Sequence, residues 1–275
     1  MSVSFVPPSQ TRLTAHWAAN VPASVAAAVV KPKPDYDHTA LRWHPLWDLA
    51  SAPLSPQEHR VGLDLVTGQT WVARGEVRLV SMELAGKTLR LALDELGEAL
   101  AAQGGPRGAV ELLDLSRPHH PVATGGTFGP WDTKQHASLR SWFAFAADVL
   151  ERERSEHPDA SALRCWPHHF DLAALWKLDD QDEPEDARSV GIGFSPGDEA
   201  YEEPYFYVLP WPPPAPEKLP SLDSGWGGWH TTGFVAAVLT ATQLAERLTE
   251  ASDRADAVSE FLAEATEAAT RVLSN

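Results

Sequence analysis

The residues best suited to chemistry lie in the segment WPHHFDLA, which places His169 two positions before Asp171. Side chains two residues apart in an extended strand project from the same face, so the imidazole and the carboxylate are expected side by side. A carboxylate that accepts a hydrogen bond from one ring nitrogen fixes the tautomer of the imidazole, which is the arrangement of an acid–base pair. The spacing therefore predicts a polar site on one face of this strand.

Two glycines predict where a ligand binds. Gly191 and Gly193 alternate with larger apolar residues in a strand-like run, so both glycines share the face opposite those side chains. Glycine inside a strand often marks the close approach of a backbone or a ligand. The alternative is that they relieve crowding beneath a tryptophan. We predict a small-molecule pocket over the two glycines, with these ligand-binding residues: His169, Asp171, Asp198, Tyr205, Tyr207 and His230.

A divalent metal is a second hypothesis for the same region. His169, Asp171 and the distant His230 have the composition of a two-histidine, one-carboxylate site, which binds iron(II) and leaves positions open for substrate. The chain has 11 histidines, so such a combination also arises by chance, and an imidazole held in structural hydrogen bonds is the competing interpretation. The sequence leaves open whether the protein is a binder or a metal-dependent enzyme.

Tryptophans supply a third hypothesis. Trp211, Trp226 and Trp229 lie in a segment rich in proline and glycine at 210–229. Flat indole faces suit the rings of sugars, so these side chains are candidates for sugar binding. Exposed together they form an apolar patch of a kind that a monomer rarely tolerates, and the segment 210–229 is also a candidate docking surface for a protein partner. The alternative is that the indoles pack over the sheet, because tryptophan is usually well buried.

Composition excludes several classes of protein. The 275 residues include 22 Lys and Arg against 38 Asp and Glu, a net charge of −16, which repels nucleic-acid phosphates and anionic membrane surfaces. The single cysteine, Cys165, has no partner for an internal disulfide, and the N-terminus lacks the basic-then-apolar layout of a signal peptide. We expect an acidic cytoplasmic protein with no nucleic-acid or membrane partner.

Hydrophobic periodicity predicts the elements that position these residues. Helices are expected at 11–30, 88–103, 132–156 and twice within 240–273. Strands are expected at 41–45, in a hairpin region at 57–83, at 109–113, in a meander over 162–209 with runs at 162–176, 189–194 and 204–209, and at 233–239. The acidic stretch at 178–186 is expected to be a solvated loop rather than a calcium site. This order predicts a single α+β domain over 1–275, with a largely antiparallel sheet and helices packed on one face.

Three motifs together resemble an uncharacterised family of bacterial proteins with a domain of unknown function. They are WPHHFDLA at 166–173, GFSPGD at 193–198 and EPYFYVLPWP at 203–212, with a weaker likeness at 38–54 and 135–138. The resemblance implies a single domain whose focus is the Phe170-Asp171 strand, and it implies no activity or substrate. Relatives often have a small residue at the position of His169, so the resemblance implies no metal ligand there.

Overall fold

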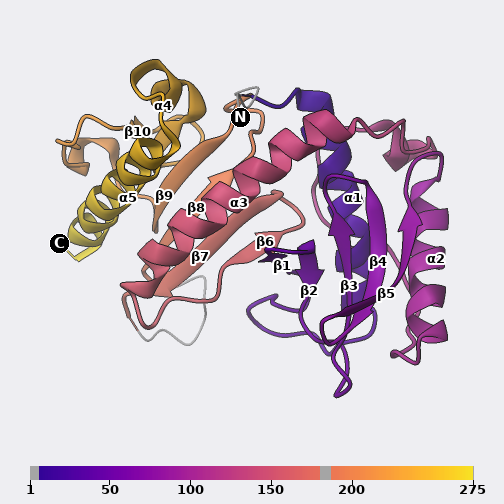
Figure 1. The fold of residues 1–275 in the computed structure, drawn as a ribbon. Coiled ribbons are helices and arrows are strands. Elements are labelled where there is room, and N and C mark those ends of the chain that lie inside the picture. The colour runs from indigo at the N-terminus through magenta and orange to yellow at the C-terminus, as the bar shows by residue number, and fades with distance from the viewer. Residues whose placement is uncertain (1–5, 180–186, 275) are drawn as a thin grey trace. The chain divides into compact units, whose positions relative to one another are not determined.

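The computed structural model describes residues 6–179 and 187–274 (Figure 1). The chain divides into two compact units, which are described separately below. The N-terminal unit comprises Pro7–Ser141 and Arg164–Phe170, and the C-terminal unit comprises mainly Trp142–Leu163 and Asp171–Asn275. The chain passes between the units more than once, so the expectation of a single domain over 1–275 stays a prediction.

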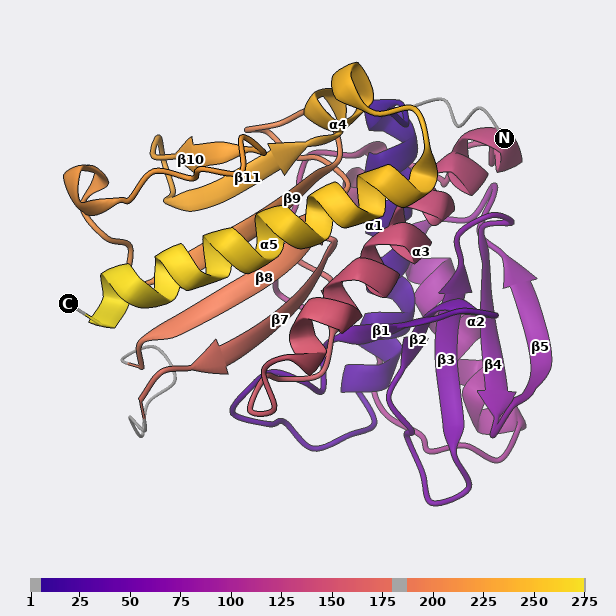
Figure 2. The same ribbon diagram turned by 60° about the vertical axis from the view of Figure 1, so that its left-hand side comes forward.

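The N-terminal unit combines antiparallel strands with two helices. Its strands follow the order β6-β1-β2-β3-β4-β5, and their bounds are β1 (Leu41–His44), β2 (Asp48–Ser51), β3 (His59–Asp64), β4 (Gln69–Arg74), β5 (Val77–Glu83) and β6 (Arg164–Trp166). The helices are α1 (Ser9–Ala27) and α2 (Leu89–Ala102). α1 packs against α2 and against β3, so helices and sheet share one core (Figure 2).

The C-terminal unit also consists of antiparallel strands and helices. Its strands follow the order β10-β11-β9-β8-β7, and their bounds are β7 (Asp171–Lys177), β8 (Ser189–Ser195), β9 (Tyr205–Trp211), β10 (Gly228–His230) and β11 (Ala236–Thr240). Two helices complete it, α4 (Ala241–Arg247) and α5 (Ala251–Ser274), and α3 (Thr133–Ser155) enters it from Trp142 onward. The prediction of an α+β fold with a largely antiparallel sheet is confirmed.

Helices cover one face of the C-terminal sheet. α5 lies along β8 and β9, as Figures 1 and 2 show. Phe194 of β8 contacts two rings of α3, with centroids 6.1 Å from Trp142 and 5.6 Å from Phe143. Burying such aromatic side chains stabilises the fold by roughly 1.5–3 kcal/mol each. The side chains that share the face of Phe194 are therefore structural.

Several predicted elements begin where the sequence indicated. Thr88 caps α2 by accepting a hydrogen bond from the amide of Leu91, and Thr240 and Gln243 form the predicted capping box of α4. The hairpin and the meander are present, whereas β2 and β10 were not predicted. None of the described helices has both the length and the apolar character that crossing a membrane requires. The acidic loop lies largely outside the described residues.

The strand predicted at 109–113 is wrong. Its backbone hydrogen-bonding groups are taken by side chains of the two helices: Leu113 N donates to Ser24 Oγ at 3.2 Å, and the carbonyl of Val110 accepts from Arg90 at 3.0 Å. A strand requires a neighbouring strand for those groups, and this segment lies against helices instead. A Cβ atom added at Gly97 of α2 would lie 3.0 Å from Val110, so the segment packs against that helix.

A buried carboxylate joins three segments of the N-terminal unit. Asp37 accepts hydrogen bonds from Lys33 and Arg42 at 2.6 Å each and from Arg164 of β6 at 2.8 Å. Burial acts to raise the pKa of Asp37, but the hydrogen bond from Lys33 and the charges of Arg42, Arg164 and Lys33 outweigh it and hold that pKa below its ordinary value. The ion pairs therefore stabilise the folded state.

We expect Asp37→Asn to lower the free energy of unfolding at neutral pH by roughly 2 kcal/mol, because it leaves clustered cations without their carboxylate. The folded pKa of Asp37 lies below the unfolded one, so its stabilisation is present above the unfolded pKa and is lost as the pH falls through the folded pKa. Urea denaturation at a series of pH values measures both effects. Asp35→Asn is the control, because Asp35 is half exposed and pairs with Arg164 alone. A difference between wild type and Asp37→Asn that persists unchanged to about pH 2 would contradict this account.

Candidate functional site

The face of the C-terminal sheet opposite Phe194 carries most of the predicted site residues. In the register of β8 with β9, Gly193 pairs with Tyr207 and Ser195 pairs with Tyr205. Paired residues project to the same side, and Asp171 joins them because it lies two positions before the β7 residue that pairs with Gly193. The predicted alternation of faces in β8 is therefore correct.

Tyr207 reaches across β8 to β7. Its hydroxyl donates a hydrogen bond of 2.5 Å to Oδ2 of Asp171, a buried carboxylate. The ring crosses over Gly193, where an added Cβ atom would lie 2.3 Å from ring atoms. Burial, and then the charge and hydrogen bond of Asp171, raise the pKa of Tyr207 well above its ordinary value. The phenol therefore stays protonated at neutral pH and acts as a fixed donor.

A second tyrosine–carboxylate pair lies on the same face. Tyr205 donates to Oδ2 of Asp198, while Oδ1 of Asp198 accepts from the amides of Ala200 at 2.8 Å and Tyr201 at 3.0 Å. The turn that presents Asp198 depends on Gly197, whose φ of 115° disfavours any other residue. Burial and the charge of Asp198 raise the pKa of Tyr205, so this phenol is also a protonated donor.

His230 belongs to a neighbouring polar contact and is fully engaged. Its Nδ1 lies 2.9 Å from the hydroxyl of Tyr201, and its Nε2 lies 2.6 Å from the carbonyl of Thr232. The ring also stacks on Phe234 with centroids 4.2 Å apart. Because Nε2 must donate to the carbonyl, Nδ1 accepts from the tyrosine, and neither nitrogen keeps a lone pair for a metal.

The structure gives no support to the predicted metal site at His169, Asp171 and His230, which stays a prediction. Besides the engaged ring of His230, the part of the chain that the structure describes contains no group of three His, Cys, Asp or Glu side chains that could hold a metal ion. The histidine count of the chain made a match in composition easy, and the competing interpretation of His230 as a structural imidazole is the correct one.

The run 162–176 is not one strand, so the alternation that placed His169 beside Asp171 does not apply, and their acid–base pair stays a prediction. β6 ends at Trp166, a turn occupies 167–170, and β7 begins at Asp171. Phe170 closes the turn with a φ of 58°, and its amide donates to the carbonyl of Trp166 at 2.7 Å. His169 is exposed in the N-terminal unit, whereas Asp171 is buried in the C-terminal unit. Pro167 was the available signal, since proline interrupts strands.

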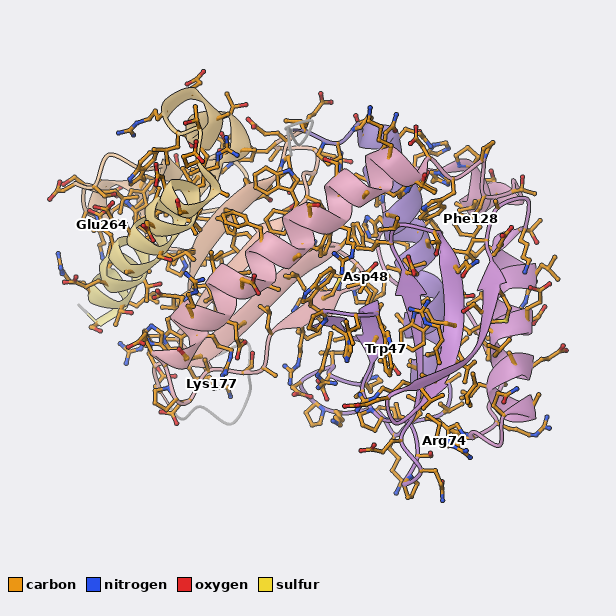
Figure 3. All side chains as sticks on the ribbon, viewed as in Figure 1. Trp47, Asp48, Arg74, Phe128, Lys177 and Glu264 are labelled. Carbon is orange, nitrogen blue, oxygen red and sulfur yellow. The ribbon has the colours of Figure 1, made fainter. Side chains whose placement is uncertain are left out.

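Of the two glycines over which a pocket was predicted, only Gly191 has open space above it. The ring of Tyr207 occupies the space over Gly193, whereas a Cβ atom at Gly191 would meet nothing nearer than the carbonyl of Leu209 at 3.8 Å. Leu175 and Leu209, which pair with Gly191 on either side, are 44% exposed and half-buried respectively. An apolar strip therefore lies open beside Tyr207. Lys177, which Figure 3 labels, is the last residue of β7.

The indoles of the segment 210–229 differ in exposure. Trp226 is buried, with the guanidinium of Arg247 3.9 Å from the centre of its ring. Trp229 is half-buried and donates from Nε1 to the carbonyl of Pro220 at 2.7 Å. Trp211 is 42% exposed. Two of the three rings therefore pack within the C-terminal unit, and the docking role of this segment stays a prediction.

Sequence reasoning missed a cluster in the N-terminal unit. His16 and Asn20 of α1 hydrogen-bond to the carbonyl of Pro167 at 3.0 and 2.9 Å, and Arg117 donates to Asn20 at 2.8 Å. His16 and Asn20 are four apart, so they share a helix face, which is the signal the sequence did offer. Their contact with a turn about 150 residues away has no sequence signature.

The chain matches no known protein family, no curated protein and no solved structure. The resemblance to an uncharacterised bacterial family therefore stays a prediction.

The two glycines of β8 should respond oppositely to the same substitution. We expect Gly193→Ala to destabilise the fold by about 1–3 kcal/mol, because the new methyl group displaces the ring of Tyr207. Gly191→Ala should leave stability unchanged or raise it by about 0.5 kcal/mol, because the methyl group enters open space and strand glycine is entropically costly. Denaturant unfolding of the two variants measures both, and equal destabilisation would contradict the placement of Tyr207.

Proposed function

We propose that the protein binds a small organic molecule on the tyrosine-bearing face of β7, β8 and β9. The observation that carries this proposal is the apolar strip at Gly191, which lies directly beside the hydrogen-bonded pair of Tyr207 and Asp171. Ligand sites typically combine an apolar surface with a few fixed polar groups that orient the ligand. The strip, with Leu175 and Leu209 as its sides, supplies the apolar surface, and the tyrosine–carboxylate pair supplies the fixed polar groups.

The protonation of the face supports binding rather than acid–base catalysis. A general acid or base works best when its pKa lies near the operating pH. The pKa values of Tyr205 and Tyr207 are raised above their ordinary value by burial and by the adjacent carboxylates, so neither phenol releases its proton near neutrality. These groups hold a fixed pattern of donors and acceptors, which suits recognition.

The carboxylates indicate the polar chemistry of the ligand. An ionised carboxylate only accepts hydrogen bonds, so a ligand group beside Asp171 or Asp198 must donate. The net charge of −16 attracts cations and repels anions. We therefore propose a ligand with an apolar body and an amine or hydroxyl group.

A thermal-shift screen of small amines and alcohols with apolar substituents tests this function. We expect a compound that raises the melting temperature of the wild type to bind Gly191→Val at least tenfold more weakly, a cost of about 1.4 kcal/mol, because the branched side chain fills the strip. Tyr207→Phe should also weaken binding, since the carboxylate then lacks its oriented donor.

Tyr36→Phe is the matched control, because Tyr36 is exposed in the N-terminal unit and should leave binding unchanged. Isothermal titration of each variant separates affinity from stability. Compounds that bind wild type and Gly191→Val equally well would show that the strip is not the site.

A further inference from the structure

The turn at 167–170 is held from behind by two residues of α1. The carbonyl of Pro167 accepts hydrogen bonds from Nε2 of His16 at 3.0 Å and from Nδ2 of Asn20 at 2.9 Å. The ring of His16 also stacks on Phe170, with centroids 5.3 Å apart and planes within 12°. Oδ1 of Asn20 accepts in turn from Nε of Arg117 at 2.8 Å. One hydrogen-bond network therefore links the turn, α1 and the guanidinium.

The partners of Arg117 in this network carry no negative charge. Besides Asn20, its guanidinium donates to the carbonyls of Leu115, at 3.0 Å, and Leu113. Burial lowers the pKa of Arg117, and the charge of Asp114, an exposed residue, acts in the opposite direction. A half-buried guanidinium bonded to neutral acceptors still attracts an anion, because hydrogen bonds between charged groups are roughly twice as strong as neutral ones.

The imidazoles around the turn are subject to positive charge alone. Burial lowers the pKa of His16 to about 4, against the hydrogen bond to Pro167, and the charges of Arg117, Arg12 and His169 lower it further. Burial likewise lowers the pKa of His168 to about 4, and there the contributing charges are His169 and Arg117. With pKa values of about 4 these two imidazoles are neutral at pH 7, and Arg117 and Arg12 are the guanidiniums whose charges act on them.

Two of these imidazoles are accessible. His169 is exposed and His168 is half-buried, and their ring centroids lie 4.1 Å apart. The turn therefore presents imidazole donors to solvent, and hydrogen bonds of Asn20 join its backbone to the guanidinium of Arg117. From this juxtaposition we infer that the turn, with His168, His169 and Arg117, binds a small oxyanion, such as the phosphate or carboxylate group of a metabolite. This inference does not depend on the function proposed for the C-terminal unit.

The turn is expected to bind an oxyanion because its charge is complementary to the anion and its backbone is already ordered. Neutral imidazoles donate through N–H, and an arriving oxyanion supplies acceptors for them and a negative charge for the guanidinium. His16 and Asn20 fix the carbonyl of Pro167, so the backbone that carries the two imidazoles is already ordered before the anion arrives. Preorganisation of this kind raises affinity by reducing the entropy lost on binding.

Titration with sulfate tests the inference, because sulfate keeps its charge across the pH range of interest. Ionic strength is held constant with chloride, and the shifts of the imidazole Cε1–H signals of His168 and His169 are followed by NMR. We expect saturable shifts of both signals and a rise in melting temperature with sulfate. His168→Gln and His169→Gln should each weaken sulfate binding by roughly tenfold, the loss that corresponds to one charged hydrogen bond.

His38→Gln is the control, since His38 belongs to the same unit but its Nδ1 accepts from the amide of Lys33. It should bind sulfate as the wild type does. Thermal melting of each variant without sulfate verifies that it folds. Because His169 is exposed, His169→Gln should fold and test the site even if His168→Gln is unstable. Parallel titrations with phosphate and with acetate distinguish the two classes of ligand. The anion that binds more tightly shows whether the turn prefers a phosphate or a carboxylate group. Unsaturable shifts, or equal binding by wild type, His169→Gln and His38→Gln, would overturn the site.

Discussion

The ring of Tyr207 crosses β8 only because Gly193 has no side chain, and this close contact arranges the face of the C-terminal sheet. It brings a phenol of β9 within 2.5 Å of the Asp171 carboxylate of β7, across the strand between them. A buried carboxylate without hydrogen bonds is costly, so the phenol both satisfies the acid and is held by it. The polar groups of the face are thereby fixed in place, and the open surface lies beside them at Gly191.

The N-terminal unit uses the same arrangement with a different ring. A Cβ atom at Gly62 of β3 would lie 2.1 Å from the indole of Trp71, its pairing partner in β4. That indole meets Trp47 edge-on at 5.4 Å and lies beneath the guanidinium of Arg78. Aromatic rings that cover strand glycines restore the packing that the missing side chain gives up. At Gly62 the covering ring only adds to the hydrophobic core, whereas at Gly193 the covering ring of Tyr207 also places a hydrogen-bond donor.

The histidines divide by the hydrogen bonds they make. His230 is fixed through both ring nitrogens and belongs to the packing of the C-terminal unit. His16 is fixed through one nitrogen and supports the turn at 167–170, where His168 and His169 face solvent in part. The two units thus carry opposite chemistry: carboxylates beside tyrosines in one, imidazoles beside a guanidinium in the other.

Sequence alone determined the helices, the cap at Thr240, the meander and the alternation of faces in β8, because each depends on hydrogen bonds or side-chain directions within a few residues. Tertiary structure decided which glycine is covered, because alternation treats Gly191 and Gly193 alike and only the ring of Tyr207 separates them. It also decided that the segment 109–113 meets helices, that Phe170 turns the chain before β7, and that α1 supports that turn. These outcomes rest on contacts between atoms far apart in the chain, which no local pattern records.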